Sequence, residues 1–141
     1  MFKVETRIKV RYVETDQMGV VHHSNYFAWF EVARVELLEK LGFPYNRLEK
    51  EGLFLPMLSA ACVYRAAAGF GDEVVVSAEL KEMTGVRMDI NYEVRKVGEE
   101  RVITQGETVH AWANSELKPV NLKKYRPDMY DVLIKVQGFE K

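Results

Sequence analysis

One stretch of helical periodicity, residues 25–41, lies among segments that alternate like β-strands, and it limits the folds open to the chain. Its large apolar side chains recur at steps of three or four residues: Tyr26, Phe30, Ala33, Leu37 and Leu41. Three more widen the apolar arc: Phe27, Val35 and Leu38. Ser24 and Asn25 are residue types that start helices, and Gly42 is a type that ends them. So wide an arc predicts a helix that is covered on more than one side.

The segments around this helix repeat with the period of two that is typical of β-strands. Residues 2–12 place six side chains on one face: Phe2, Val4, Thr6, Ile8, Val10 and Tyr12. Four further strands are expected after the helix, at 53–66, 73–83, 86–95 and 101–115, with a short edge piece at 119–122. Turn residues separate them at Gly69–Asp72, 84–85 and 97–100. A helical turn is expected within 43–52, and a closing helix is expected to begin near Pro127.

This order of elements, a strand, one long helix and then a meander of strands, is typical of an α+β domain. The sequence predicts a curved antiparallel sheet of five to six strands wrapped around a long central helix. The 141 residues, 48% of them hydrophobic, suit a single domain that spans 1–141.

Composition excludes several classes of function. With a net charge of −1, the chain has no excess of basic residues that would indicate binding to nucleic acid or to a membrane surface. The single cysteine, Cys62, allows neither an internal disulfide nor a cysteine-based zinc cluster, so a reducing, cytoplasmic setting is expected. No apolar run approaches the roughly 18 residues of a membrane span. The N-terminal segment is charged and alternating, so it is not expected to be a signal peptide.

The segment "ETDQMGVVHHSNY", residues 14–26, carries more polar groups than a plain connection needs. Asp16 follows the first strand, Gly19 permits a tight bend, and His22 and His23 come directly before the helix. The start of a helix offers unpaired N–H groups and the positive end of the dipole, which can stabilise an oxyanion. A carboxylate on the facing loop can attack or activate water. The segment therefore predicts an acyl-transfer site.

Simpler interpretations of these residues stay open. Asp16 is also a common turn residue, and His22 and His23 could be loop residues without a role. Metal binding by the histidine pair is disfavoured because consecutive side chains rarely converge on one ion. His110 is expected to be a core or interface histidine, and Cys62 a buried spectator. Three helix charges are expected to be solvated or at an interface: Glu31, Arg34 and Glu36.

The string "YVETDQMGVVHHSNYFAWFEVARVELLEKLG" resembles the signature of the hotdog-fold acyl-CoA thioesterases. Within them it is most similar to the 4-hydroxybenzoyl-CoA thioesterase branch, which includes the acyl-CoA thioesterases associated with the Tol-Pal system. Six residues meet the family pattern: Asp16, Gly19, Val21, His23, Asn25 and Tyr26. The later "FGDEVVV", residues 70–76, resembles the Gly-Asp pair at the start of the family's third strand. The resemblance covers roughly residues 5–125.

The resemblance implies hydrolysis of an acyl-CoA thioester without a metal or redox cofactor. Asp16 would be the nucleophile or general base, and the backbone N–H of His23 would polarise the thioester carbonyl. Four more residues are expected to bind substrate or to order the site: Tyr12, Gly19, Asn25 and Tyr26. Glu14 is expected to line the site as well. Four cations are candidates for the CoA phosphates: Arg65, Arg87, Arg95 and Lys124.

A partner subunit is expected because a single sheet of about five strands leaves its edges exposed. The resemblance implies a homodimer or homotetramer in which two sheets join and the sites lie at the subunit interface. Two alternatives stay open. One is a hotdog-fold hydratase or dehydratase that pairs His23 with Glu36, and the other is a non-catalytic acyl-thioester binding domain. The sequence does not name the acyl group, although His23 argues against a dedicated hydroxybenzoyl substrate.

Overall fold

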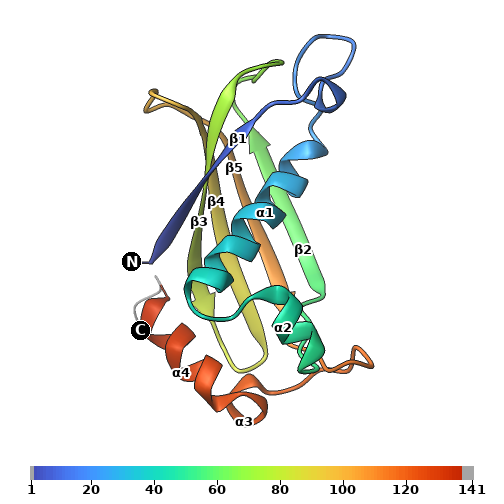
Figure 1. The fold of residues 1–141 in the computed structure, drawn as a ribbon, viewed down its shortest axis with the longest axis vertical. Coiled ribbons are helices and arrows are strands. Elements are labelled where there is room, and N and C mark those ends of the chain that lie inside the picture. Colours follow the sequence, from blue (N-terminus) through green and yellow to red (C-terminus); the bar gives the residue numbers. More distant parts are fainter. Residues whose placement is uncertain (1, 138–141) are drawn as a thin grey trace.

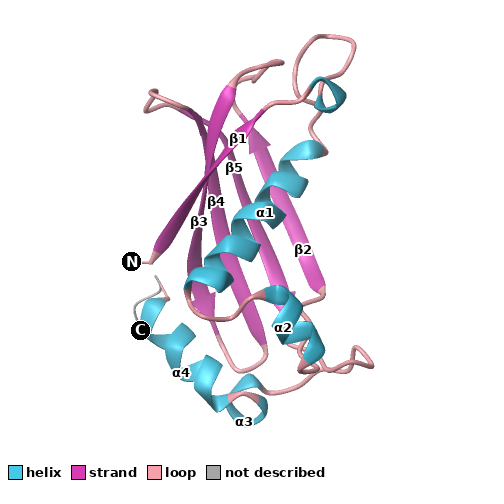
Figure 2. Ribbon diagram, viewed as in Figure 1, coloured by secondary structure: helices cyan, strands magenta, loops and turns pink. Residues whose placement is uncertain are grey.

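A five-stranded antiparallel sheet carries one long helix across a single face (Figure 1). The computed structural model describes residues 2–137. The strand order is β1-β3-β4-β5-β2, and Figure 2 shows β2 alone at one edge of the sheet. The strands are β1 (Lys3–Lys9), β2 (Met57–Tyr64), β3 (Glu73–Met83), β4 (Arg87–Lys96) and β5 (Val102–Ala111). The predicted α+β hotdog fold, with a central helix against an antiparallel sheet, is confirmed.

The helices account for the remaining regular structure. They are α1 (Asn25–Lys40), α2 (Tyr45–Lys50), α3 (Leu122–Tyr125) and α4 (Pro127–Val136). The expected turn in 43–52 and the closing helix at Pro127 are therefore confirmed. The strand predicted for 2–12 is too long, because Tyr12–Glu14 folds into a short 3-10 turn in which Thr15 N–H donates to the Tyr12 carbonyl over 3.1 Å. The prediction of a short edge strand at 119–122 is wrong, because Pro119 forms only an isolated β-bridge with Ala113.

Helix α1 buries one stripe against the sheet. Its buried residues are Tyr26, Trp29, Phe30, Ala33, Arg34, Leu37 and Leu38. On the other side Ala28, Glu31 and Val32 are exposed, so the prediction of cover on more than one side is wrong within the described chain. The helix ends as predicted: Gly42 takes a φ of +99°, and Phe43 N–H donates to the Leu38 carbonyl over 2.8 Å.

A glycine in β5 sets how closely α1 approaches the sheet. The Phe30 ring stacks on Tyr92 of β4 with centroids 4.4 Å apart and planes 13° from parallel. A Cβ at Gly106 would overlap the Phe30 ring. The missing side chain therefore makes the room that the aromatic stack occupies.

Arg34 was expected to be solvated or at an interface, and within this chain it is 6% exposed. Its Nε donates to the Tyr45 hydroxyl over 3.0 Å, and one terminal nitrogen donates to the Tyr92 hydroxyl over 3.3 Å. The chain of contacts continues from Tyr92 to Thr108 (2.7 Å) and on to Nε2 of His110 (2.9 Å). Burial and the Arg34 charge lower the pKa of His110 to about 4. The prediction of a core histidine at His110 is confirmed.

Strand β2 is one of the two edge strands, and among the described strands its side chains are the most exposed. Every residue of the strand is exposed or half-buried, and the exposed set includes Met57, Leu58, Val63 and Tyr64. Cys62 is half-buried, and burial raises the pKa of its thiol, which disfavours the nucleophilic thiolate.

Candidate active site

Two loops at one end of the sheet are joined through their backbones, and they carry the candidate site. Val10 N–H donates to the Asp72 carbonyl over 2.8 Å, and Val21 N–H donates to the Ala68 carbonyl over 2.9 Å. Val20 also forms an antiparallel bridge with Gly69. We call this set of backbone pairings, between residues 10–21 and 68–72, the loop clasp. The clasp holds the segment that contains Asp16 against the start of β3.

Asp16 sits in a tight turn inside that segment. Its Oδ1 accepts a hydrogen bond from Met18 N–H over 2.9 Å, and its carbonyl accepts one from Gly19 N–H over 3.0 Å. Gly19 takes a φ of +80°, a conformation that L side chains rarely adopt. Oδ2 of Asp16 accepts no hydrogen bond from residues 2–137. One carboxylate oxygen is therefore anchored while the other is free.

Glu14, two residues earlier, is structural and does not line the pocket. It is 4% exposed and accepts hydrogen bonds from Arg11 N–H and from the Trp29 indole, both over 2.8 Å. Burial alone would raise the pKa of Glu14, but these donors outweigh it and hold the pKa below its usual range. The expectation that Glu14 lines the site is wrong.

The start of α1 is held by one side chain that the sequence predicted, that of Asn25, and by one that it did not, that of Tyr64. Asn25 Nδ2 donates to the Glu14 carbonyl over 2.8 Å, so Asn25 orders the helix start as expected. Ser24 does not cap the helix with its side chain, because its hydroxyl lies 2.8 Å from Nδ1 of His22. The carbonyl of His23 accepts a hydrogen bond from the Tyr64 hydroxyl over 3.0 Å. The backbone N–H of His23 donates to no acceptor among the described residues.

A pocket of about 350 Å³ opens between this helix start, the Asp16 turn and the end of β2. Its lining residues are Asp16, Met18, Val20, Val21, His23, Tyr26, Tyr64, Arg65, Ala66 and Ala67. Three of the predicted site residues, Asp16, His23 and Tyr26, thus come together. Gly19 shapes the turn from outside the lining.

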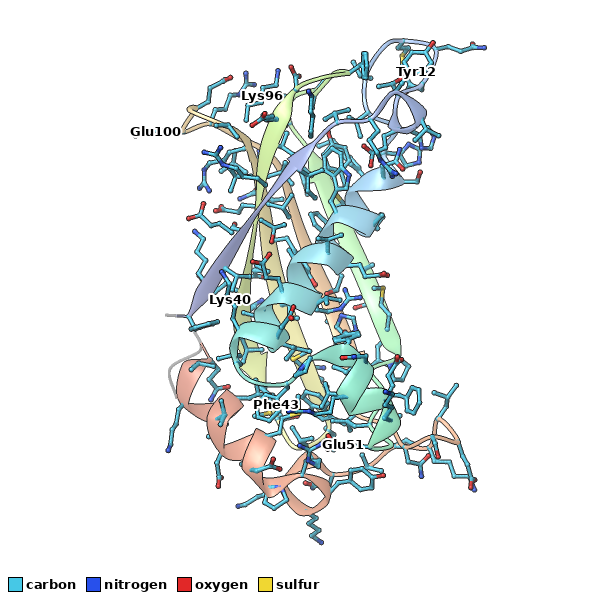
Figure 3. All side chains as sticks on the ribbon, in the orientation of Figure 1. Tyr12, Lys40, Phe43, Glu51, Lys96 and Glu100 are labelled. Carbon is cyan, nitrogen blue, oxygen red and sulfur yellow. The ribbon has the colours of Figure 1, made fainter. Side chains whose placement is uncertain are left out.

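Tyr12 lies apart from the pocket. Its side chain is 76% exposed and meets the edge of the Phe70 ring, with centroids 5.6 Å apart. Figure 3 shows Tyr12 at the loop end of the molecule, opposite Phe43 and Glu51. Its role in binding substrate stays a prediction.

Of the four candidate cations, Arg65 lines the pocket. Its guanidinium donates to Oε1 of Gln105 over 2.9 Å and is otherwise exposed. Arg87 and Arg95 pair with Asp89 and Glu93 along β4. Lys124 belongs to α3 at the far end of the molecule (Figure 1).

A second hollow, of about 400 Å³, lies on the face of the sheet away from α1, among residues such as Ser77, Glu79 and Glu107. It contains none of the predicted site residues. Among residues 2–137, no group of three His, Cys, Asp or Glu side chains is placed to hold a metal ion. None of the helices described in this chain is long and apolar enough to cross a membrane.

The dyad of the dehydratase alternative does not form within one chain. Glu36 lies thirteen residues after His23, which is roughly 20 Å along a helix that rises 1.5 Å per residue. Its carboxylate contacts the Thr6 hydroxyl and pairs with Lys40 over 3.3 Å. His23 and Glu36 of the same subunit therefore cannot act on one acyl carbon.

Known proteins resemble this chain along most of its length. A family model described as the thioesterase-like superfamily matches residues 10–133. A Bacillus subtilis protein named "Putative acyl-CoA thioesterase YneP" is 34% identical over 124 residues, which cover 87% of this chain and 89% of the relative. The solved structure of a DHNA-CoA thioesterase from Staphylococcus aureus superposes with a TM-score of 0.91 at 34% identity, over 96% of this chain and 91% of that one. A hypothetical protein from Thermus thermophilus superposes with a TM-score of 0.87 at 38% identity, over 96% and 98%. The chain therefore belongs to the thioesterase-like superfamily, and the prediction of a hotdog-fold thioesterase is confirmed.

Proposed function

We propose that the protein hydrolyses an acyl-CoA thioester to the free acid and CoA at the pocket between Asp16 and the start of α1. One observation carries the proposal: Asp16 and His23 line the same pocket, and neither Oδ2 of Asp16 nor the backbone N–H of His23 is hydrogen-bonded to any of residues 2–137. These are the two groups that acyl transfer requires, one to deliver a nucleophile and one to hold the developing oxyanion.

The reaction follows from the placement of these groups. The thioester carbonyl oxygen accepts a hydrogen bond from His23 N–H, and the positive end of the helix stabilises the negative charge that develops there. Asp16 either attacks the carbonyl carbon directly or removes a proton from a water molecule that attacks. The C–S bond then breaks, and the CoA thiolate leaves and is protonated. In the direct route, water afterwards hydrolyses the acyl-aspartyl anhydride, so both routes consume one water.

The relatives support CoA as the carrier of the acyl group. The Bacillus subtilis relative is named for acyl-CoA, and the Staphylococcus aureus structure is of a thioesterase for DHNA-CoA. Arg65 at the pocket is the best-placed candidate for the CoA phosphates because it presents a fork of donors to solvent. We further propose that residues 1–141 act as one domain in the cytoplasm.

Thiol release, followed with a disulfide reagent over short-chain, long-chain and aromatic acyl-CoAs, tests the proposal. We expect turnover on at least one class of ester. Calorimetric binding of acyl-CoA without thiol release on any ester would contradict hydrolysis and favour a non-catalytic binding domain. Hydration of an enoyl-CoA without thiol release would favour the hydratase.

We also propose a homodimer in which β2 of two subunits pair edge to edge and antiparallel. The exposed apolar side chains of β2 support this pairing, because a long uncovered edge strand is a template for another strand. Tyr64 lies at one end of β2 and Met57 at the other. A two-fold axis through the strand would bring Met57 of the partner subunit beside the pocket. The family resemblance implies sites at the subunit interface, which agrees with this placement.

Introducing a charge on this edge is expected to separate the subunits. Leu58 is 61% exposed, so Leu58→Lys leaves the folded monomer intact, but in the proposed pairing it places a charge opposite the apolar side chain of Val63 of the partner subunit. Light scattering at micromolar concentration should give a dimer for the wild type and a monomer for the variant. Val86→Lys, an exposed apolar residue in the turn after β3, is the matched control and should keep the dimer. A monomeric wild type would contradict the proposal.

A further inference from the structure

The side chain of Tyr64 connects the sheet to the start of α1. Tyr64 is the last residue of β2, and its hydroxyl donates to the carbonyl of His23 over 3.0 Å. This bond joins residues 41 positions apart in the sequence. It therefore fixes where the helix start lies relative to the edge of the sheet.

Few other interactions hold the His23 carbonyl. The only other donor to it among the described residues is Tyr26 N–H, at the long distance of 3.4 Å. Ser24 supplies no side-chain cap. Asn25 and the N–H of His22 are tied to the Glu14 carbonyl, which secures the loop side of the helix start. Tyr64 secures the sheet side.

The Tyr64 ring is itself held in place. It meets the edge of the Tyr26 ring at 5.4 Å and that of the His23 ring at 6.2 Å between centroids. Burial, together with Cys62, raises the pKa of the Tyr64 phenol, so it stays protonated and remains a donor at ordinary pH. Tyr64 also lines the pocket with Asp16.

We propose that Tyr64 is a positioning residue for the oxyanion donor: by holding the carbonyl of His23, its hydroxyl fixes the Cα of His23, which is one end of the peptide plane that carries the His23 N–H. That plane also contains the carbonyl of His22, which accepts a hydrogen bond from Asn25 N–H over 3.0 Å. Loss of the Tyr64 bond lets the Cα of His23 shift, and this shift tilts the plane and turns the His23 N–H away from the thioester. This inference rests on the proposed function. It means that a residue of the edge strand β2 helps to stabilise the transition state, because an oxyanion donor is effective only when it is held in place before the reaction.

Tyr64→Phe tests the link because it removes the hydroxyl and keeps the ring. We expect kcat to fall about 10-fold, which is about 1.4 kcal/mol, while KM stays within about twofold, since a donor that acts mainly in the transition state affects kcat. Tyr125→Phe is the matched control. Tyr125 makes the same kind of bond, from its hydroxyl to the Gly52 carbonyl over 3.2 Å, at the other end of the molecule. It should keep the wild-type kcat.

An unchanged kcat in Tyr64→Phe would overturn the proposal. So would a raised KM with unchanged kcat, because the phenol would then bind substrate directly. The backbone amide of Asn25, which donates to the His22 carbonyl in the peptide plane of the His23 N–H, gives a second readout that needs no turnover. Its hydrogen exchange should speed up in Tyr64→Phe and not in Tyr125→Phe, and equal exchange would overturn the proposal. Absence of thiol release from the wild type would instead count against the proposed hydrolysis, and the exchange experiment would still decide the role of Tyr64.

Discussion

Asp16→Asn is expected to lower kcat at least about 100-fold, or roughly 2.7 kcal/mol of activation free energy. An amide is neither a nucleophile nor a base of useful strength, so both routes through Asp16 are lost. The turn should survive, because the amide oxygen of asparagine can still accept the hydrogen bond from Met18 N–H that Oδ1 of Asp16 accepts now. The loss should therefore appear in catalysis and not in folding.

Thiol release with the best ester from the panel measures this effect, with the melting temperature recorded in parallel. Asp131→Asn on α4 removes an exposed carboxylate far from the pocket and should keep the wild-type rate. Equal rates in the wild type and Asp16→Asn would rule out Asp16 as the catalytic group. They would shift the proposal toward another source of the nucleophile.

Glu14→Ala is expected to lower the free energy of unfolding by about 2–4 kcal/mol, because it leaves buried donors without an acceptor. The donors are the backbone N–H of Arg11 and the indole N–H of Trp29. The Trp29 indole comes from α1, so the lost carboxylate also loosens the first loop from the helix. Thermal or urea unfolding measures the change. Glu5→Ala, which removes an exposed carboxylate from β1, should stay within about 0.5 kcal/mol of the wild type.

The Glu14 carboxylate should also make stability depend on pH. Its pKa is lowered in the folded protein, so its contribution is fully present above the pKa of the unfolded chain and is lost as the pH falls through the folded pKa. Glu14→Gln should flatten the acid limb of the stability profile. An unchanged acid limb, or a Glu14→Ala variant as stable as Glu5→Ala, would show that the hydrogen bonds of Glu14 contribute little.

Much of the fold could be predicted because its elements carry local patterns. The alternation in 73–83 and the turn residues at 84–85 gave β3 and its hairpin with β4, and Gly42 marked the end of α1. Errors arose where tertiary contacts override local pattern. The alternation of side chains continues through Tyr12, but the strand ends earlier. Residues 12–14 form a 3-10 turn, which places the Glu14 carboxylate where it accepts the hydrogen bond from the Trp29 indole.

The candidate site was predictable only in part, for a related reason. Glu14 and Asp16 are both carboxylates in one loop, and no local signal indicates that the first is buried and the second borders a pocket. Arg34 looks like a solvated helix charge, yet two tyrosine hydroxyls on other elements accept its hydrogen bonds. Tyr64 lies 41 residues from its partner, so its contact exists only in three dimensions.

The loop clasp has a consequence for how such a protein can change over evolution. The clasp is made by backbone groups of residues 10–21 and 68–72, so apart from the glycines with positive φ, Gly19 and Gly71, it does not require particular side chains at those residues. Side chains at Met18, Val20 and Phe70 can therefore be exchanged while the Asp16 turn keeps its place. Under the proposed function, the carboxylate of Asp16 and the pocket-lining side chains of Met18 and Val20 belong to different residues of one loop, so the lining can change in sequence while Asp16 is kept.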